Sequence, residues 1–316
     1  MKLIIQIPCY NEEDYLAETV SALPKSINGI DEIETLVIDD GSTDKTVDVA
    51  NWVKVDHIVK LNRHQGLAAA FKRGLDEAVK LGADIIVNTD ADNQYCADDI
   101  EKIVEPILKG ESDVVIGARP IDSIKSFSWF KKLLQKFGSA FVRFVSGCDV
   151  VDAPSGFRAF SKSSAVNLYI FDKYSYTMES ILQAKAKNFK IVSVPVRVND
   201  FRRESRLIKN VFQYIRNSVT TILRMFLIYK PFKFFGILAT FLFLAGVFIG
   251  LRYLYFMYIG DGAGHVQSLI LSSIFILSGI QTGIIAFLAD LNGINRKLLE
   301  DIQLRLKFIE NYKDFN

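Results

Sequence analysis

Thr89-Asp90-Ala91-Asp92-Asn93-Gln94 is the stretch of sequence on which the interpretation of the fold depends. It follows an apolar run at residues 83–88, which predicts a buried strand of a parallel sheet. Two carboxylates one residue apart at the C-terminal end of such a strand point into the crevice where open α/β sheets bind ligands. Their oxygens suit Mg²⁺ or Mn²⁺, which in such sites also hold substrate phosphates. The competing interpretation is an ordinary strand-end turn, because Asp and Asn are common turn residues.

The flanking sequence alternates between short apolar runs and amphipathic segments. Runs typical of strands lie at residues 2–7, 34–38, 57–61, 113–117, 155–160 (a turn and strand) and 190–198. Helical patterns lie between them, at residues 13–26, from about 42, and at 66–81, 97–108 and 177–188. This alternation predicts an α/β fold in which helices cover both faces of a parallel sheet.

Polar residues follow the C-terminal ends of these strands. They are Tyr10, Glu12, Asp39, Asp40, Asp90, Asp92 and Arg119. Because the carboxyl ends of parallel strands share one edge of a sheet, these side chains are expected to converge there. The sequence contains neither G-x-G-x-x-G nor G-x-x-x-x-G-K-[ST], so neither a dinucleotide-binding fold nor a P-loop is indicated. With these two motifs excluded, we expect phosphate to be bound through a metal ion that carboxylates hold.

The composition restricts the class of protein further. The chain has 316 residues, and its formal net charge of +2 argues against a nucleic-acid-binding protein with a broad basic surface. A hydrophobic content of 50% and a mean hydropathy of +0.19 direct attention to membrane segments. Cys9, Cys96 and Cys148 show neither C-x-x-C nor zinc-ligand spacing, which is typical of free thiols in a reducing compartment. The short apolar run after Met1 does not fit a signal peptide, so we expect the N-terminal part to stay inside the cell.

Two long apolar segments lie near the C-terminus. Residues 234–259 contain Arg252 as their only charge, and residues 266–289 contain none, so both exceed the length that crosses a bilayer. The link between them holds no Lys or Arg, whereas the flanks hold Lys230, Lys233, Arg296, Lys297, Arg305 and Lys307. By the positive-inside rule, the tip of this hairpin faces outward and both flanks face the cytoplasm. The sequence thus predicts a two-span protein of the cell membrane with a cytoplasmic catalytic domain.

Three further segments have an apolar stripe. Residues 126–145 fit either a core helix or a helix at the membrane surface, because basic residues accompany the aromatic ones. Residues 207–226 combine a wide apolar stripe with a basic polar face, which favours a helix in the bilayer interface over a buried amphipathic helix. Residues 298–309 predict a charged, amphipathic terminal helix.

Five motifs occur in an order that resembles the family-2 glycosyltransferases of GT-A fold. They are Pro8-x-Tyr10-Asn11-Glu12-Glu13, Asp39-Asp40-Gly41-Ser42, Asp90-Ala91-Asp92-x-Gln94, Gly117-x-Arg119 and Ser155-Gly156-Phe157-Arg158-Ala159-Phe160. Within that family the chain is similar to the polyprenyl-phosphate glycosyltransferases, of which the dolichyl-phosphate mannose synthases are the best-known members. The resemblance covers about residues 2–210 and, through the two spans, most of the rest.

The resemblance implies an α/β fold in four parts. A GT-A (Rossmann-like) domain with a mostly parallel sheet would occupy residues 1–205. An interfacial amphipathic helix would follow at residues 206–230 and a two-helix transmembrane hairpin at 231–290. A cytoplasmic helix at residues 291–316 would end the chain.

The resemblance also implies roles for the residues at the strand ends. Those expected to bind the nucleotide are Pro8, Tyr10, Glu12, Asp39 (base or ribose) and Ala91. Those expected to hold Mg²⁺ or Mn²⁺ on the diphosphate, and so to bind the nucleotide as well, are Asp90, Asp92 and Gln94. The implied catalytic residues are Asp92, Arg119 and Arg202.

Arginines are expected to bind phosphate. Arg119 would sit near the sugar phosphate or the acceptor phosphate. In the family, a motif resembling Arg-Gly-x-Ser-Lys binds phosphate after the last strand, and here Arg202 and Arg206 are the matching cations. Arg203 replaces the glycine, which changes the expected backbone shape but keeps the positive charge. The alternative role for Arg202 and Arg206 is simple attraction to anionic lipid.

No side-chain base is implied. Some family members carry, at the position of Gly156, an Asp that has been considered a base, and Asp152 is only a distant substitute here. Glu179 falls by the family pattern in a helix that faces the same region; the alternative is a surface charge. A phosphate monoester already carries roughly −1.5 to −2 charges near neutral pH, so cations that place it matter more than a base. We therefore hypothesise in-line attack by a lipid phosphate oxygen on the anomeric carbon, with inversion.

The predicted activity is transfer of a single sugar from a nucleotide sugar, of GDP-mannose or UDP-glucose type, to a polyprenyl (dolichyl or undecaprenyl) phosphate. A second hypothesis is a processive polysaccharide synthase, but neither Trp52 nor Trp129 lies in the Gln-x-x-Arg-Trp context of that class. A third is a non-catalytic membrane scaffold, against which the intact metal-binding set argues. The expected partners are both substrates and the bilayer, without nucleic acid, and a two-span anchor favours a homo-oligomer.

Overall fold

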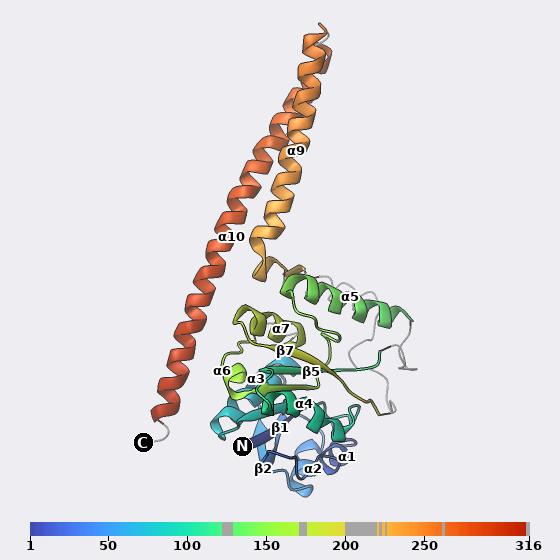
Figure 1. Ribbon diagram of the computed structural model, residues 1–316, viewed down its shortest axis with the longest axis vertical. Coiled ribbons are helices and arrows are strands. Elements are labelled where there is room, and N and C mark those ends of the chain that lie inside the picture. Colours follow the sequence, from blue (N-terminus) through green and yellow to red (C-terminus); the bar gives the residue numbers. More distant parts are fainter. Residues whose placement is uncertain are drawn as a thin grey trace. The chain divides into compact units, whose positions relative to one another are not determined.

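A computed structural model of the protein describes residues 1–121, 129–170, 176–199, 220, 223–224, 226–260 and 263–313 (Figure 1). The chain divides into two compact units, Met1–Ile222 with Glu310–Asn316, and Leu223–Ile309. The first unit contains a β-sheet covered by helices, and the second is a helical hairpin.

The first unit is built on one seven-stranded sheet with the order β3-β2-β1-β4-β6-β5-β7. The strands are β1 (Lys2–Cys9), β2 (Glu32–Asp39), β3 (His57–Lys60), β4 (Ile85–Asn88), β5 (Val114–Ala118), β6 (Arg158–Ser161) and β7 (Ile191–Pro195). Neighbouring strands pair in parallel, except that β6 runs antiparallel between β4 and β5. The predicted α/β class with a mostly parallel sheet is therefore confirmed, and the direction of β6 corrects the wholly parallel pattern that alternation suggested.

Alternate residues of the central strand β1 serve two separate cores, as the two-residue period of a strand requires. Leu3, Ile5 and Ile7 face the helices α1 (Leu16–Ser21), α2 (Thr46–Trp52) and α4 (Ile100–Leu108). Ile4 faces the helices α3 (Leu67–Lys80) and α6 (Lys162–Val166) and the first residue of α7 (Tyr176–Ala186). Strands that are buried on both faces explain the nearly continuous apolar runs in the sequence.

Helix α1 is shorter than the predicted helix at residues 13–26. It begins at Leu16, after a turn in which the Glu12 carbonyl accepts from the Tyr15 and Leu16 amides. It ends at Ser21, because Pro24 biases the preceding residue away from helical geometry.

Helix α5 (Trp129–Ser146) matches the segment for which the sequence left two interpretations open. Val142 is buried in a small core with β5 and α7, and Val145 is buried as well. Leu133, Phe137 and Phe144 are 54%, 57% and 72% exposed. The interpretation as a core helix therefore accounts for one side of α5 only.

The second unit contains α9 (Pro231–Tyr258), the short helix η2 (Ala263–His265) and α10 (Val266–Lys313) as far as Ile309. Both long helices are long and apolar enough to cross a membrane. The terminal helix predicted at residues 298–309 is not separate, because α10 continues through it without interruption. Of the interfacial helix predicted at residues 207–226, only residues 220, 223–224 and 226 are described, and these are helical.

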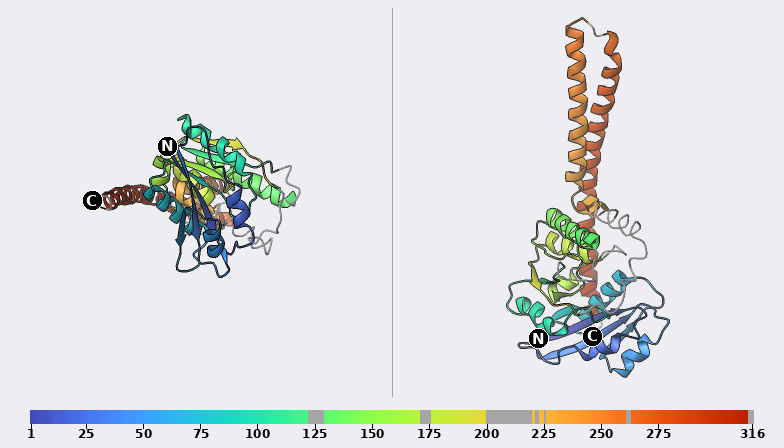
Figure 2. Two further views of the ribbon diagram at one scale, coloured as in Figure 1. Left: turned by 90° about the horizontal axis from the view of Figure 1, so that it is seen from below. Right: turned by 90° about the vertical axis from the view of Figure 1, so that its right-hand side faces the viewer.

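Small residues let α9 and α10 approach closely; Figure 2 shows the two helices, orange and red, side by side. The Ser272 hydroxyl donates to the Gly246 carbonyl at 2.7 Å, from one helix to the other. A Cβ added to Gly279 would lie 2.8 Å from the backbone nitrogen of Phe243. Close backbone contact at small residues is how helices associate where no hydrophobic effect drives them together.

A leucine in place of Gly246 should separate the two helices, because its Cβ would lie 2.7–3.0 Å from atoms of α10. Overpacking of this kind costs about 1–3 kcal/mol. The matched control is Gly236→Leu on the same helix, where an added Cβ meets no atom within 4 Å. A cysteine pair at Ala239 and Gly283, whose Cβ atoms would be 4.0 Å apart, reports the packing through disulfide formation. Cross-linking in membranes should fall for the first variant only, and an equal yield in both would contradict the close approach.

Candidate active site

The topology brings the polar strand ends to one edge of the sheet. Strands β3, β2, β1 and β4 are parallel neighbours, and the double reversal through β6 makes β5 run in the same direction. The segments that follow β1, β2, β4 and β5 therefore begin at the same edge, which is where ligands bind in open α/β sheets. Residues expected to bind nucleotide or metal that lie in or directly after these strands are Pro8, Tyr10, Glu12, Asp39, Asp90, Ala91, Asp92, Gln94 and Arg119.

The loop that carries Asp90 and Asp92 is held from two sides. On one side, the Thr19 hydroxyl of α1 donates to the Ala91 carbonyl at 2.7 Å. On the other, the Asn199 amide group donates to the Asn93 carbonyl at 2.9 Å. The loop is thus fixed by contacts outside its own strand, which a simple surface turn does not require.

The Asp90 carboxyl is partly buried and lies in an excess of negative charge. Burial, together with the neighbouring carboxylates of Asp92 and Glu12, raises the pKa of Asp90 to about 7, although Arg119 and Arg158 act in the opposite direction. Like charges that share a site with little water favour the protonated form. A divalent cation would remove this repulsion.

The donor set fits a metal ion that also binds substrate phosphate. Within the part of the chain that the structure describes, no three His, Cys, Asp or Glu residues form a closed metal site. Asp90 and Asp92 supply two carboxylates, and Mg²⁺ binds through one or two carboxylates together with substrate phosphates rather than in an all-protein cage. The Gln94 amide N–H donates to Asp92 at 3.2 Å, which ties the third predicted ligand to the same turn.

Arg119 is held rigidly by Asp152. The guanidinium donates through two nitrogens to the Asp152 carboxylate, at 2.7 and 3.0 Å, and the Arg119 backbone N–H adds a third hydrogen bond. Asp152 is fully buried, and both of its oxygens accept from Arg119. Such paired geometry fixes the plane of the guanidinium, and it leaves Asp152 poorly suited to act as a base.

The position of Gly156 has no room for the carboxylate that some family members carry there. A Cβ at Gly156 would lie 3.0 and 3.1 Å from the Asp90 oxygens and 3.0 Å from the Tyr176 hydroxyl. An Asp side chain would therefore displace Asp90 and add a further negative charge.

The segments that follow β1 and β3 contribute an aromatic pair. The Tyr10 ring stacks on His64 with 3.9 Å between ring centroids. Asp40 fixes the loop that carries His64, because it accepts from the Gln65 and Gly66 amides at 2.8 Å each and contacts the His64 ring at 2.9 Å. The Asp40 carboxylate thus turns toward this loop rather than toward Asp90.

For three further residues named from the sequence, the structure gives either no description or a buried position. Arg202 and Arg206 lie outside the described residues. Glu179 is 3% exposed and accepts from the Gln183 amide group at 3.2 Å, so the alternative that Glu179 is a surface charge is wrong.

Sequence reasoning assigned no role to Arg158, which is fully buried beside the site. Its guanidinium donates to the carbonyls of Ser155, Ala153 and Thr177 at 2.8, 2.6 and 2.6 Å. Burial lowers its pKa to about 10, so the side chain stays charged at neutral pH. A single arginine within an apolar strand was the signal that could have identified it.

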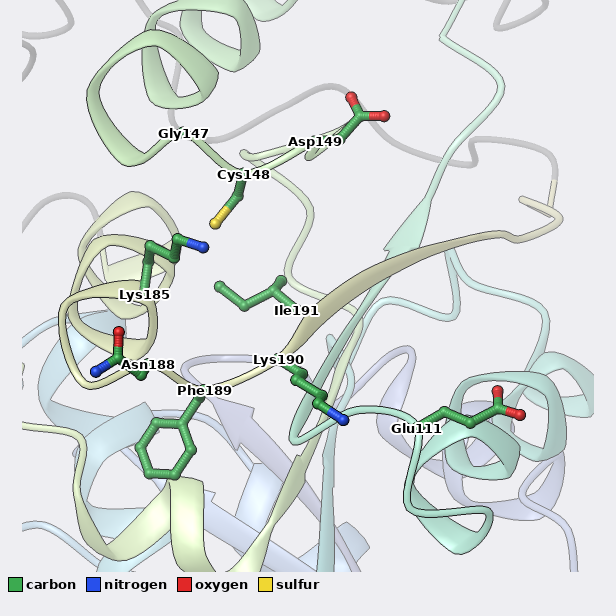
Figure 3. Close-up of a pocket in the computed structure, with 9 residues that line it drawn as sticks. All are labelled: Glu111, Gly147, Cys148, Asp149, Lys185, Asn188, Phe189, Lys190 and Ile191. Atoms are coloured by element: carbon green, nitrogen blue, oxygen red, sulfur yellow. The ribbon is translucent and has the colours of Figure 1, made fainter.

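An open cavity of about 440 Å³ lies elsewhere and is lined in part by Cys148, Lys185 and Lys190 (Figure 3). Its lining includes Ile191, which pairs with Val114 at the amino ends of β7 and β5. The polar strand ends lie at the carboxyl edge, so this cavity is not part of the candidate site.

Comparison with known proteins assigns residues 4–168 to Glycosyl transferase family 2. UDP-N-acetylglucosamine--dolichyl-phosphate N-acetylglucosaminyltransferase of Methanococcus voltae is 32% identical over 216 residues, which cover 60% of this chain and 83% of that protein. Dolichol-phosphate mannosyltransferase of Pyrococcus furiosus is 33% identical over 228 residues, which cover 69% of this chain and 62% of that protein.

Among solved structures, glucosyl-3-phosphoglycerate synthase of Mycobacterium tuberculosis, in complex with Mn²⁺, UDP and glucosyl-3-phosphoglycerate, has a similar fold. The TM-score is 0.54 at 19% identity, over 70% of this chain and 79% of that chain. At this identity the likeness supports the fold alone.

Replacing Asp90 by Asn should raise the free energy of unfolding of the metal-free protein, and the difference from the wild type should grow with pH. The pKa of Asp90 is raised to about 7 in the folded state, so the folded protein keeps a proton that the unfolded chain has already released. The stability that this proton contributes is present at low pH and is lost as the pH rises toward 7. Unfolding midpoints measured in EDTA from about pH 5 to about pH 8 test this, with Asp98→Asn, whose side chain is 79% exposed, as control. A margin that is constant with pH would contradict the raised pKa.

Replacing Asp152 by Leu should destabilise the protein by about 3–5 kcal/mol, because it leaves the buried Arg119 without its hydrogen-bonded counter-charge. The matched control is Glu105→Gln, which breaks an ion pair with Lys109 in which both side chains are 56% exposed. That change should cost at most about 1 kcal/mol. Denaturant titration of both variants measures the difference, and equal losses would show that the Arg119 pair has no special role.

Proposed function

Because the chain belongs to glycosyl transferase family 2, we propose that it transfers one sugar from a nucleotide sugar to a membrane polyprenyl phosphate. The family that the sequence motifs indicated is confirmed, and with it the assignment of the protein as a glycosyltransferase. The acceptor is inferred from two kinds of support. The relatives from Methanococcus voltae and Pyrococcus furiosus are named for dolichyl phosphate, and this chain carries two helices of spanning length.

The observation that carries the proposal is the Asp90–Asp92 loop, which holds two carboxylates at the ligand-binding edge, where burial and neighbouring negative charge raise the pKa of Asp90 to about 7. Asp90, Asp92 and Gln94 would hold Mg²⁺ or Mn²⁺, which stabilises charge on the departing diphosphate when bound. Pro8, Tyr10, Glu12, Asp39 and Ala91 would bind the nucleotide. GDP-mannose and UDP-glucose are the donor types that we propose.

The reaction is an in-line displacement at the anomeric carbon. A phosphate oxygen of the acceptor forms the new bond to this carbon, the bond to the diphosphate oxygen breaks, and the configuration inverts. The nucleoside diphosphate leaves with the bonding electron pair. The Arg119 guanidinium, oriented by Asp152, would stabilise this charge, because it is fixed before the reaction and costs no reorganisation.

The acceptor is already an anion, so the reaction needs no side-chain base. A phosphate monoester carries roughly −1.5 to −2 charges near pH 7. Arg202 and Arg206 would place this phosphate at the depth of the lipid headgroups. No carboxylate replaces Gly156, and Asp152 is occupied by Arg119, which agrees with a reaction that dispenses with a base.

The proposed arrangement places the reaction at the cytoplasmic side of the cell membrane. Residues 1–205 would form the cytoplasmic GT-A domain and 206–230 an interfacial helix. Residues 231–290 would form the membrane hairpin and 291–316 a cytoplasmic extension. Association into a homo-oligomer would strengthen such a thin anchor.

The test is to incubate the purified full-length protein with Mn²⁺ or Mg²⁺, a panel of nucleotide sugars and a short polyprenyl phosphate. A singly glycosylated lipid is expected. Asp92→Ala should lower the rate by at least about 100-fold, whereas Asp98→Ala, on an exposed side chain of the same segment, should leave it unchanged. Products with several sugars would indicate a processive synthase. Nucleotide binding without any glycolipid would indicate a scaffold.

A further inference from the structure

Two amide side chains lie inside the sheet, where the surrounding positions are apolar. Gln6 in β1 and Asn88 in β4 are both fully buried, and they are partners in the register of these parallel strands. Both lie on the face of the sheet that α3 covers, since Ile4 and Ile86, two residues before each, pack in that core.

The two amides form a hydrogen-bonded series that ends on Gly156. Asn88 Nδ2 donates to the Gly156 carbonyl at 2.8 Å, and Gln6 Nε2 donates to Asn88 Oδ1 at 2.8 Å. A carbonyl oxygen can only accept, so Gly156 determines which atom of Asn88 faces it, and Asn88 then determines the orientation of Gln6. The series therefore has one direction, from β1 through β4 to the residue before β6.

The other polar group of Gly156 is held by the same part of the chain. The Gly156 N–H donates to the Tyr95 hydroxyl at 3.1 Å. Tyr95 is 5% exposed, and its ring stacks on Phe157 with 4.9 Å between centroids. Both backbone groups of Gly156 are thus fixed by side chains that flank the Asp90–Asp92 loop.

The fixed backbone of Gly156 forms the wall beside the Asp90 carboxylate. The position of its missing Cβ lies 3.0 and 3.1 Å from the two Asp90 oxygens. Because Gly156 carries no Cβ, the Asp90 carboxylate can lie in the space beside its backbone, and the hydrogen bonds from Asn88 and to Tyr95 fix where that space lies.

Stability does not account for this arrangement. Gln6 Oε1 is buried and accepts no hydrogen bond from the described residues, which costs about 1–3 kcal/mol. Gly74 of α3 approaches so closely that a Cβ there would lie 2.4 Å from the same oxygen. Two apolar side chains at residues 6 and 88 would remove this cost. Buried polar groups that lower stability are expected beside functional sites, where they serve the function.

We propose that Asn88 and Gln6 are positioning residues that hold the Gly156 backbone against Asp90 and so orient this carboxylate for the metal ion. The inference rests on the metal-binding role of Asp90 in the proposed function. Groups that orient a metal ligand typically change metal affinity or activity by about 10–100-fold when they are replaced.

The test uses shape-matched variants of the full-length protein. Asn88→Leu removes the hydrogen bonds to Gly156, Gln6 and Tyr176. Gln6→Met leaves the bond from Asn88 to Gly156 in place and removes those to Asn88 and to the Phe71 carbonyl. The control is Gln183→Met, which removes another buried amide that hydrogen-bonds the backbone of Tyr169. Mn²⁺ binding in the presence of UDP or GDP is measured from the signal of free Mn²⁺ in electron paramagnetic resonance. Thermal unfolding of each variant reports whether the protein is folded.

Asn88→Leu should weaken Mn²⁺ binding by about tenfold or more, and Gln6→Met should weaken it less. The double variant should have the Mn²⁺ affinity of Asn88→Leu, because the hydrogen bond that links Gln6 to Gly156 runs through Asn88, whereas the second partner of Gln6, the Phe71 carbonyl, lies on α3. Gln183→Met should lose stability but keep Mn²⁺ affinity. In the sugar-transfer assay, the Mn²⁺ concentration for half-maximal rate should rise in the Asn88 variant, while KM for the lipid phosphate stays the same.

Wild-type Mn²⁺ affinity in a folded Asn88→Leu or Gln6→Met variant would overturn the proposal, as would a wild-type protein that binds no Mn²⁺. If Asn88→Leu does not fold, Gln6→Met decides the question alone. The proposed function fails differently, because the wild-type protein would then bind Mn²⁺ and nucleotide yet form no glycolipid. The two failures are therefore distinguishable.

Discussion

The burial of Asp90 beside a second carboxylate is the constraint on which the candidate site depends. Burial, together with the neighbouring charge of Asp92, raises the pKa of Asp90. The two nearby arginines have other hydrogen-bonding partners. Arg119 donates to Asp152, and Arg158 donates mainly to backbone carbonyls, while the positive charge of both favours the ionised form of Asp90. In the proposed function, a divalent cation held by these carboxylates would add positive charge at the same place.

The antiparallel strand β6 is what completes this edge. It enters between β4 and β5, and its paired register sets Arg158 opposite Asn88. As a consequence, Gly156 and Arg158 reach Asp90 across a sequence separation of more than sixty residues. The loop before β6 forms a wall that no side chain of the parallel strands could supply. A side chain at residue 156 would crowd the Asp90 carboxylate, because an added Cβ would lie 3.0 and 3.1 Å from its two oxygens.

In the proposed function, the two units of the chain have different roles. The family match covers residues 4–168, which contain the Asp90–Asp92 loop and the polar strand ends. The hairpin lies beyond the matched residues and is held together by close helix contact at glycines. We infer that the sheet unit recognises the donor and that the apolar helices bring it to a lipid acceptor. The close packing at Gly246 and Gly279 gives the anchor a defined shape rather than two independent spans.

The sequence by itself determined the α/β class, the family, the two apolar helices and the carboxylate pair at a strand end. These features depend on local periodicity and on motifs in a fixed order, which a single chain displays directly. The sequence did not determine the direction of β6, the continuity of α10 or the pairing of Arg119 with Asp152. Nor did it reveal the link between Gln6 and Asn88, because the sequence does not show which buried group an amide in another strand will hydrogen-bond. Only the tertiary structure decided these points, since each depends on contacts between segments that are far apart in the chain.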